Sequence, residues 1–62
     1  MFKSSKELME FIKENTDQNG WFTTDYIKAE PDEWIVLREQ FADLMNNGYI
    51  RRINNQMFKV LR

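Results

Sequence analysis

The chain contains neither cysteine nor histidine, which narrows the ways in which a domain of 62 residues can become stable. A domain of this size buries only about 60% of its unfolded surface, so such domains often rely on disulfides or a bound metal. Without cysteine and histidine, neither a disulfide nor a zinc site is available. The sequence therefore predicts a single domain, residues 1–62, that is stabilised by a dense apolar core.

Aromatic residues supply much of the material for this core. There are nine, together with four methionines that can fill gaps: Phe2, Phe11, Trp21, Phe22, Tyr26, Trp34, Phe41, Tyr49 and Phe58. An alternative role is a stacking platform for single-stranded nucleic acid. We expect most of them to be core, because so small a domain needs them inside, and we expect Trp21 and Trp34 to be partly exposed. An exposed Trp suits a protein interface.

Local signals in the first half predict two helices separated by a short strand. Ser4 and Glu7 have the spacing of a capping box, and the helix that they begin should end near Asn15. Turn-forming residues follow, and Trp21-Phe22 then predicts a short strand. A second, short helix is expected from Thr24 to Ala29, capped by Thr23 or Thr24 and with Tyr26 and Ile27 on its inner face.

A third and longer helix is expected from Pro31 to Asn47. Proline disfavours helical geometry in the preceding residue and suits the first turn of a new helix. Apolar residues then recur at helical spacing and predict a buried stripe: Trp34, Leu37, Phe41, Leu44 and Met45. The residues expected to face outward are Val36, Glu39, Gln40, Asp43 and Asn47. Gly48 fits the left-handed position that closes a helix.

The C-terminal residues predict a β-hairpin. Tyr49–Ile53 and Met57–Leu61 are rich in β-branched and aromatic residues, and Asn54-Asn55-Gln56 lies between them as a loop. A three-residue loop would place Ile50 opposite Val60 on the core side, whereas a two-residue loop would shift the pairs. The sequence leaves this register open.

In this order of elements the chain resembles the winged helix-turn-helix family over essentially its whole length. The resemblance is carried by Trp21-Phe22 as first strand, by the two following helices, and by the exit Leu44–Ile50 into a hairpin, which that family calls the wing. It implies an α+β fold, a small winged helix with three helices and a C-terminal hairpin. It also implies DNA binding, in which the third helix reads the major groove and the wing contacts phosphates.

Charge is distributed very unevenly along the chain. Five basic and ten acidic residues precede Tyr49, whereas the last fourteen residues contain four basic residues and no acid. A basic wing suits phosphate contacts, with polar residues at its tip. The candidate nucleic-acid-binding residues are Arg51, Arg52, Asn54, Asn55, Gln56, Lys59 and Arg62. Two other interpretations remain open, namely a sheet edge protected by charge, and pairing of Arg51 or Arg52 with the acidic helix.

The third helix has the wrong charge for reading DNA. From Glu30 to Asp43 it contains five acidic residues and one basic residue, and Glu39 and Asp43 would repel phosphates. Two functions follow. The first is a small transcription regulator that contacts DNA through its wing, as a homodimer. The second is an interaction module, of the size of phage or mobile-element proteins, that docks on another protein through Trp34, Val36, Glu39 and Asp43.

Several other classes of function are disfavoured. Without His and Cys the chain lacks the commonest general base and the strongest nucleophile, so we expect no enzyme and no cofactor. The spacing around Asp17–Gly20 departs from that of a calcium loop, so no metal is expected. No apolar run approaches the ~20 residues of a membrane span, and no secretory signal is visible. We expect a complete small soluble protein in the cytoplasm.

Overall fold

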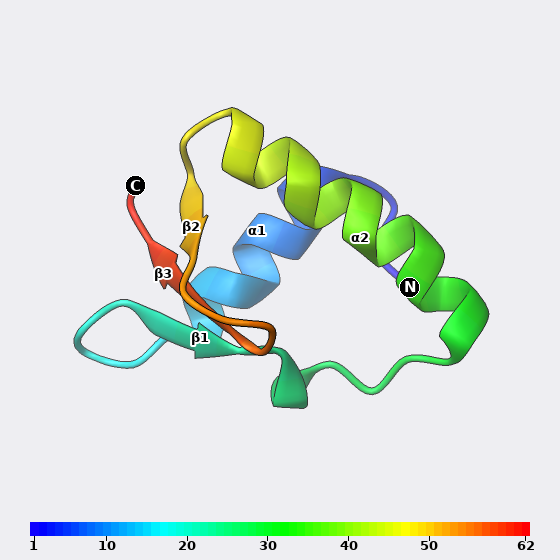
Figure 1. Cartoon of the computed structure of the whole chain (residues 1–62), viewed down its shortest axis with the longest axis horizontal. Coiled ribbons are helices and arrows are strands. Elements are labelled where there is room, and N and C mark those ends of the chain that lie inside the picture. The colour runs from blue at the N-terminus through cyan, green and yellow to red at the C-terminus, as the bar shows by residue number, and fades with distance from the viewer.

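A computed structural model describes all residues from Met1 to Arg62 and shows two α-helices beside a three-stranded antiparallel sheet (Figure 1). The elements in chain order are α1 (Ser5–Glu14), β1 (Trp21–Thr23), the 3-10 turn η1 (Thr24–Tyr26), α2 (Pro31–Asn46), β2 (Ile50–Arg52) and β3 (Met57–Val60). The strand order is β1-β3-β2, so the last strand is the central one. The protein is a small α+β fold.

The expected winged helix with three helices and a C-terminal hairpin is wrong. In place of a helix from Thr24 to Ala29 there is one 3-10 turn, which ends when Ile27 adopts extended geometry (φ −98°, ψ 116°). This backbone buries Ile27, whereas Tyr26, expected to face inward, is 53% exposed. The C-terminal residues do form a hairpin, and its second strand β3 also pairs with β1, so the three strands make one sheet.

Hydrogen bonds to side chains near the first turn define where the two α-helices begin. The Ser4 hydroxyl accepts a hydrogen bond from the amide of Glu7, as expected. The Glu7 carboxylate, however, accepts from the amide of Lys3 and not from that of Ser4. At the start of α2, the Glu33 carboxylate accepts a hydrogen bond from the amide of Glu30 at 3.0 Å, across Pro31.

The exit from α2 sets the direction of the hairpin. Gly48 has φ +74°, and the amides of Gly48 and Tyr49 donate to the carbonyls of Met45 and Leu44. This closure of the helix by a left-handed glycine confirms the role predicted for Gly48. The chain then turns directly into β2.

The hairpin has the register of a three-residue loop. Ile50 pairs with Val60, Arg51 with Lys59 and Arg52 with Phe58, and Ile53 donates to the carbonyl of Met57. Directly opposed residues of antiparallel strands share a face, and neighbours along a strand alternate. Ile50, which is buried, therefore lies on the face toward the helices, and Arg51 and Lys59 lie on the other.

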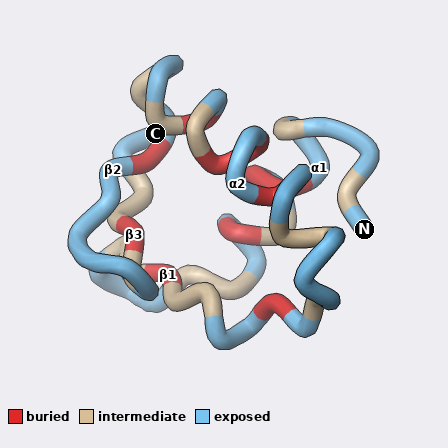
Figure 2. The backbone as a smooth tube through the Cα atoms, turned by 45° about the vertical axis from the view of Figure 1, so that its right-hand side comes forward, coloured by how far each residue is buried: buried red, intermediate tan, exposed pale blue.

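The core lies between the helices and one face of the sheet (Figure 2). The Phe41 and Phe58 rings are stacked with centroids 4.7 Å apart, and the Phe11 and Phe22 rings are nearly perpendicular with centroids 6.2 Å apart. Each fully buried side chain of this size contributes about 1.5–3 kcal/mol to the burial free energy. The buried apolar residues are Leu8, Met9, Ile12, Phe22, Ile27, Leu37, Phe41, Leu44, Ile50 and Phe58.

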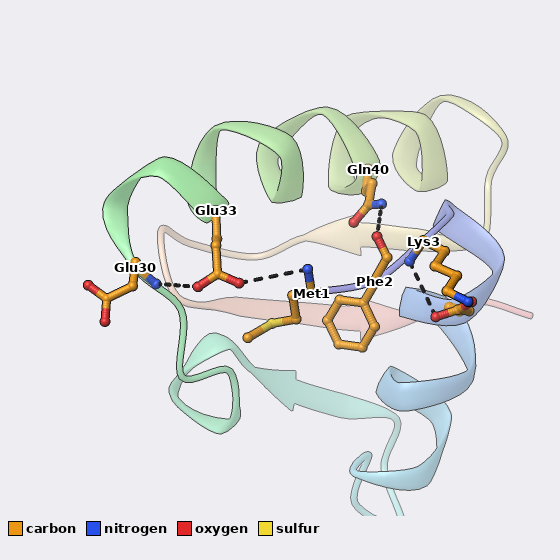
Figure 3. Close-up of polar contacts among 7 residues, drawn as sticks. Met1, Phe2, Lys3, Glu30, Glu33 and Gln40 are labelled. Atoms are coloured by element: carbon orange, nitrogen blue, oxygen red, sulfur yellow. Dashed lines mark hydrogen bonds and ion pairs between the residues drawn. The ribbon is translucent and has the colours of Figure 1, made fainter.

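The N-terminal segment lies along α2 (Figure 3). The Gln40 amide donates to the carbonyl of Phe2 at 3.0 Å, and the Met1 amino group lies 3.7 Å from the Glu33 carboxylate. Gln40 is therefore buried, contrary to the prediction that it faces outward.

No helix combines the length and the apolar character that are needed to cross a bilayer.

Candidate nucleic-acid interface

The pleat of the sheet divides the basic residues of the hairpin between two faces. Arg51 and Lys59 lie directly opposite each other and turn away from the helices. Arg52 lies on the opposite face of the sheet, paired with Phe58. The sequence groups these side chains, but the register separates them into two sites.

The face that turns away from the helices is here called the outer sheet face. The alternation of side chains and the pairing of Leu61 with Tyr49 and of Ile53 with Met57 assign eight residues to it. They are Trp21, Thr23, Tyr49, Arg51, Ile53, Met57, Lys59 and Leu61. Both helices pack into the core on the other face, and Tyr49, Ile53 and Leu61 remain exposed. The outer sheet face contains no acidic residue.

Basic groups and aromatic rings lie next to each other on this surface. Lys59 pairs with Trp21 across β1 and β3, and its Nζ lies 5.8 Å from the centre of the Trp21 ring. At the other corner, the Arg62 guanidinium lies 5.5 Å from the centre of the Tyr49 ring. Such contacts contribute only about 0.5–1 kcal/mol at exposed sites, so each cation can leave its ring at small cost.

The polar residues at the tip of the hairpin mainly close the turn. Oδ1 of Asn54 accepts from the amides of Gln56 and Met57 at 2.8 and 2.9 Å. Oδ1 of Asn55 accepts from the Arg52 guanidinium, whose Nε also donates to the carbonyl of Asn54. The Gln56 side chain makes no hydrogen bond and is exposed. Of the three predicted tip residues, Gln56 is the one whose side chain is free to contact a ligand.

The basic residues of the hairpin have no carboxylate partner within the protein. The structure contains one ion pair, between the Met1 amino group and Glu33. Pairing of Arg51 or Arg52 with the acidic helix, one interpretation of the sequence, is therefore wrong. Asp17, which precedes β1, uses its Oδ1 to accept from the amides of Asn19 and Trp21 at 2.8 and 2.9 Å.

A second basic site lies between α2 and the hairpin, on the opposite side of the sheet from Arg51. Here Arg38 of α2 and Arg52 of β2 line one pocket of about 280 Å³. The sequence offers no reason to expect Arg38 at a binding site, because it is the one basic residue among the acidic residues of this helix. Its position beside Arg52 depends on the packing of α2 on the hairpin, for which no local signal exists.

Of the residues of the alternative interaction site, Val36, Glu39 and Asp43 share one exposed side of α2, and Trp34 does not. Val36 is 52% exposed and its neighbour Ile35 is 60% exposed, and Glu39 and Asp43 face solvent. Trp34 is half-buried and packs against the core. A pocket of about 230 Å³ between α2 and the N-terminal segment is lined by Val36 and Glu33 among others.

Sequence reasoning missed two aromatic members of the outer sheet face as site residues. Trp21 and Tyr49 were counted with the core aromatics, although Trp21 was also expected to be partly exposed. The available signal was the alternation with Phe22 and Ile50, since a strand that buries one residue turns the next outward.

No group of three or more acidic side chains is arranged to hold a metal ion. Comparisons of the chain with protein-family models, with curated proteins and with solved structures find no match.

Proposed function

We propose that the protein is a small regulatory protein that binds nucleic acid through its basic hairpin, residues 49–62. The observation that carries this proposal is that Arg51, Lys59 and Arg62 border the outer sheet face, which contains no acidic residue, and that none of them has a carboxylate partner. Arg52, on the other face of the sheet, also lacks a carboxylate partner. Unpaired cations on a surface without acids attract a polyanion and release its counterions on binding. α2 is not the contacting element, because Glu39 and Asp43 occupy its exposed side.

The test is a titration of labelled DNA at several salt concentrations. Binding should weaken linearly on a log–log plot, and each lost phosphate contact should reduce the slope by about 0.9 for duplex or 0.7 for single strands. We expect the double variant Arg51→Ala, Arg52→Ala to show this flattening. The matched control is Lys13→Ala, Lys28→Ala, which removes the same charge from exposed positions outside the hairpin. Absence of binding at low salt would refute the proposal.

A second candidate function is docking on another protein through α2. It is supported by the exposure of Ile35 and Val36 beside the carboxylates of Glu39 and Asp43, since apolar residues with charged neighbours suit interfaces. A partner captured by the protein and lost on Glu39→Lys, Asp43→Lys would support this function. A partner retained by that variant but lost on Arg51→Ala, Arg52→Ala would assign the docking to the hairpin instead.

A further inference from the structure

The outer sheet face places a half-buried and an exposed aromatic residue, Trp21 and Tyr49, beside cations that have no carboxylate partner. Trp21, Lys59 and Arg51 form a row across the three strands, in the order β1, β3, β2. Tyr49 directly precedes β2, two residues from Arg51, and the Arg62 guanidinium lies at its ring. Neighbouring strands are about 4.8 Å apart, and residues two apart along a strand are about 6.8 Å apart. The backbone positions of Trp21 and Tyr49 are thus separated by roughly 12 Å.

We propose that the nucleic acid bound by this protein is single-stranded, and that its bases stack on Trp21 and Tyr49 while Lys59, Arg51 and Arg62 contact the phosphates between them. This inference rests on the proposed function and adds the class of nucleic acid and the two stacking residues. A duplex presents only base edges in its grooves, whereas a single strand can turn its base faces toward aromatic rings.

Charge alone cannot supply much affinity here. Three cations border the outer sheet face, and Arg52 lies on the other side of the sheet. Stacking of a base on an aromatic side chain strengthens binding by about 5- to 150-fold per base. With two rings, stacking can therefore contribute as much as the phosphate contacts, which compensates for the small number of cations.

The cation–π contacts do not prevent this use of the rings. Lys59 Nζ lies 5.8 Å from the centre of the Trp21 ring, near the outer limit of such contacts at ~6 Å. A small displacement of its flexible side chain frees the ring and moves the cation toward a neighbouring phosphate. The same holds for Arg62 at 5.5 Å from the Tyr49 ring.

Charge complementarity favours nucleic acid over a protein as the occupant of this face. The outer sheet face has no acidic residue, and the adjacent Asp17 carboxylate is engaged by two backbone amides. The exposed Ile53 and Leu61 add apolar contact for bases or sugars. A surface that binds another protein is expected to carry both acidic and basic residues. The outer sheet face carries only basic ones.

The test uses three probes of equal length, about 12 nucleotides, which is within the ~4–16 nucleotides bound by a single-strand-binding domain. The probes are oligothymidylate, a mixed-sequence duplex and an abasic oligomer that keeps the phosphates without bases. We expect oligothymidylate to bind more tightly than the other two. The Trp21→Leu and Tyr49→Leu variants, which keep apolar bulk but lose the ring, should each weaken oligothymidylate binding by about 5-fold or more.

Two controls separate stacking from loss of structure. Tyr26→Leu removes an exposed ring that is outside the outer sheet face and should leave oligothymidylate binding unchanged. Binding of the abasic oligomer should be the same for the Trp21→Leu variant and the unaltered protein, because the cations remain. Circular dichroism establishes that each variant is folded. The Trp21→Tyr variant keeps an aromatic ring and should therefore still bind oligothymidylate.

The outcomes distinguish this inference from the proposed function. Equal or tighter binding of the duplex, with no effect of Trp21→Leu and Tyr49→Leu, would overturn the inference and leave nucleic-acid binding through the hairpin intact. An equal loss of abasic and thymidylate binding in Trp21→Leu would also overturn it, because the ring would not be acting on bases. Failure of all three probes to bind at low salt would overturn both.

Discussion

Arg51 and Lys59 lie directly opposite each other in the β2–β3 ladder, with both side chains on the outer sheet face. Opposed like charges destabilise a sheet, and no carboxylate of the protein compensates either of them. A bound polyanion removes this repulsion. The pair that weakens the free sheet is therefore expected to strengthen the complex with nucleic acid.

Replacing Arg51 by Thr should stabilise the free protein and weaken its binding of nucleic acid. The expected gain is about 0.2–1 kcal/mol, because the like-charge pair is lost and Thr suits a strand. In a domain of this size a gain of 1 kcal/mol raises Tm by about 4–8 °C. Thermal unfolding followed by circular dichroism at low salt measures it. The matched change Lys28→Thr, in an exposed loop, should leave Tm unchanged, and a lower Tm for Arg51→Thr would contradict the argument.

Gly48 should tolerate Asn better than Ala. Its φ of +74° is strained for residues with a Cβ by about 1–2 kcal/mol, and Asn is one of the few that adopt it readily. Steric contact is not the cause, because a Cβ at this position would meet nothing closer than the Arg62 side chain at 3.9 Å. Urea unfolding should therefore rank the unaltered protein first, Gly48→Asn second and Gly48→Ala last. Equal stability of the two variants would mean that the left-handed backbone is not required.

Asn54 should matter for stability and Gln56 for binding. Replacing Asn54 by Ala removes the acceptor for two backbone amides at the hairpin tip, with an expected loss of about 1–3 kcal/mol if those amides stay unpaired. Exposure of the tip to water should place the loss at the lower end of that range. Gln56→Ala removes no intramolecular hydrogen bond, so its Tm should be unchanged. A destabilised Gln56→Ala with a stable Asn54→Ala would show that the turn is closed differently.

Reversal of charge on α2 should affect nucleic-acid binding only weakly. Glu39 and Asp43 lie on α2, which packs on the side of the sheet opposite to Arg51 and Lys59. At physiological ionic strength charges separated by more than about 8 Å are largely screened. The variant Glu39→Lys, Asp43→Lys should therefore change the affinity little at that salt. A large increase would show that α2 itself approaches the phosphates.

The features that were predicted correctly from the sequence are set by neighbours in the chain. The cap at Ser4 and the helix closure at Gly48 depend on hydrogen bonds within four or five residues, so composition at those positions suffices. The predicted helix from Thr24 to Ala29 is wrong beyond its first turn: Thr23 caps the 3-10 turn as expected, but the buried Ile27 has an extended backbone, and tertiary packing overrides the local preference there.

The candidate site depends on contacts between distant parts of the chain. Trp21 and Lys59 are separated by most of the sequence, and only the pairing of β1 with β3 brings the ring to the cation. Gln40 was expected on the surface, but it follows Leu37 by three residues and precedes Leu44 by four, so it lies on the buried side of α2, where the N-terminal segment covers it. Alternation with Phe22 and Ile50 indicates that Trp21 and Tyr49 turn outward, but no local signal places these residues beside the basic side chains.

The most direct test of nucleic-acid binding by the outer sheet face is the backbone amide NMR spectrum of ¹⁵N-labelled protein during titration with oligothymidylate. The account predicts that shifts concentrate at Trp21, Arg51 and Lys59 and are accompanied by a shift of the Trp21 indole signal. The amide of Glu39 should stay in place. Shifts concentrated on α2, or an unchanged spectrum at low salt with excess oligonucleotide, would contradict it.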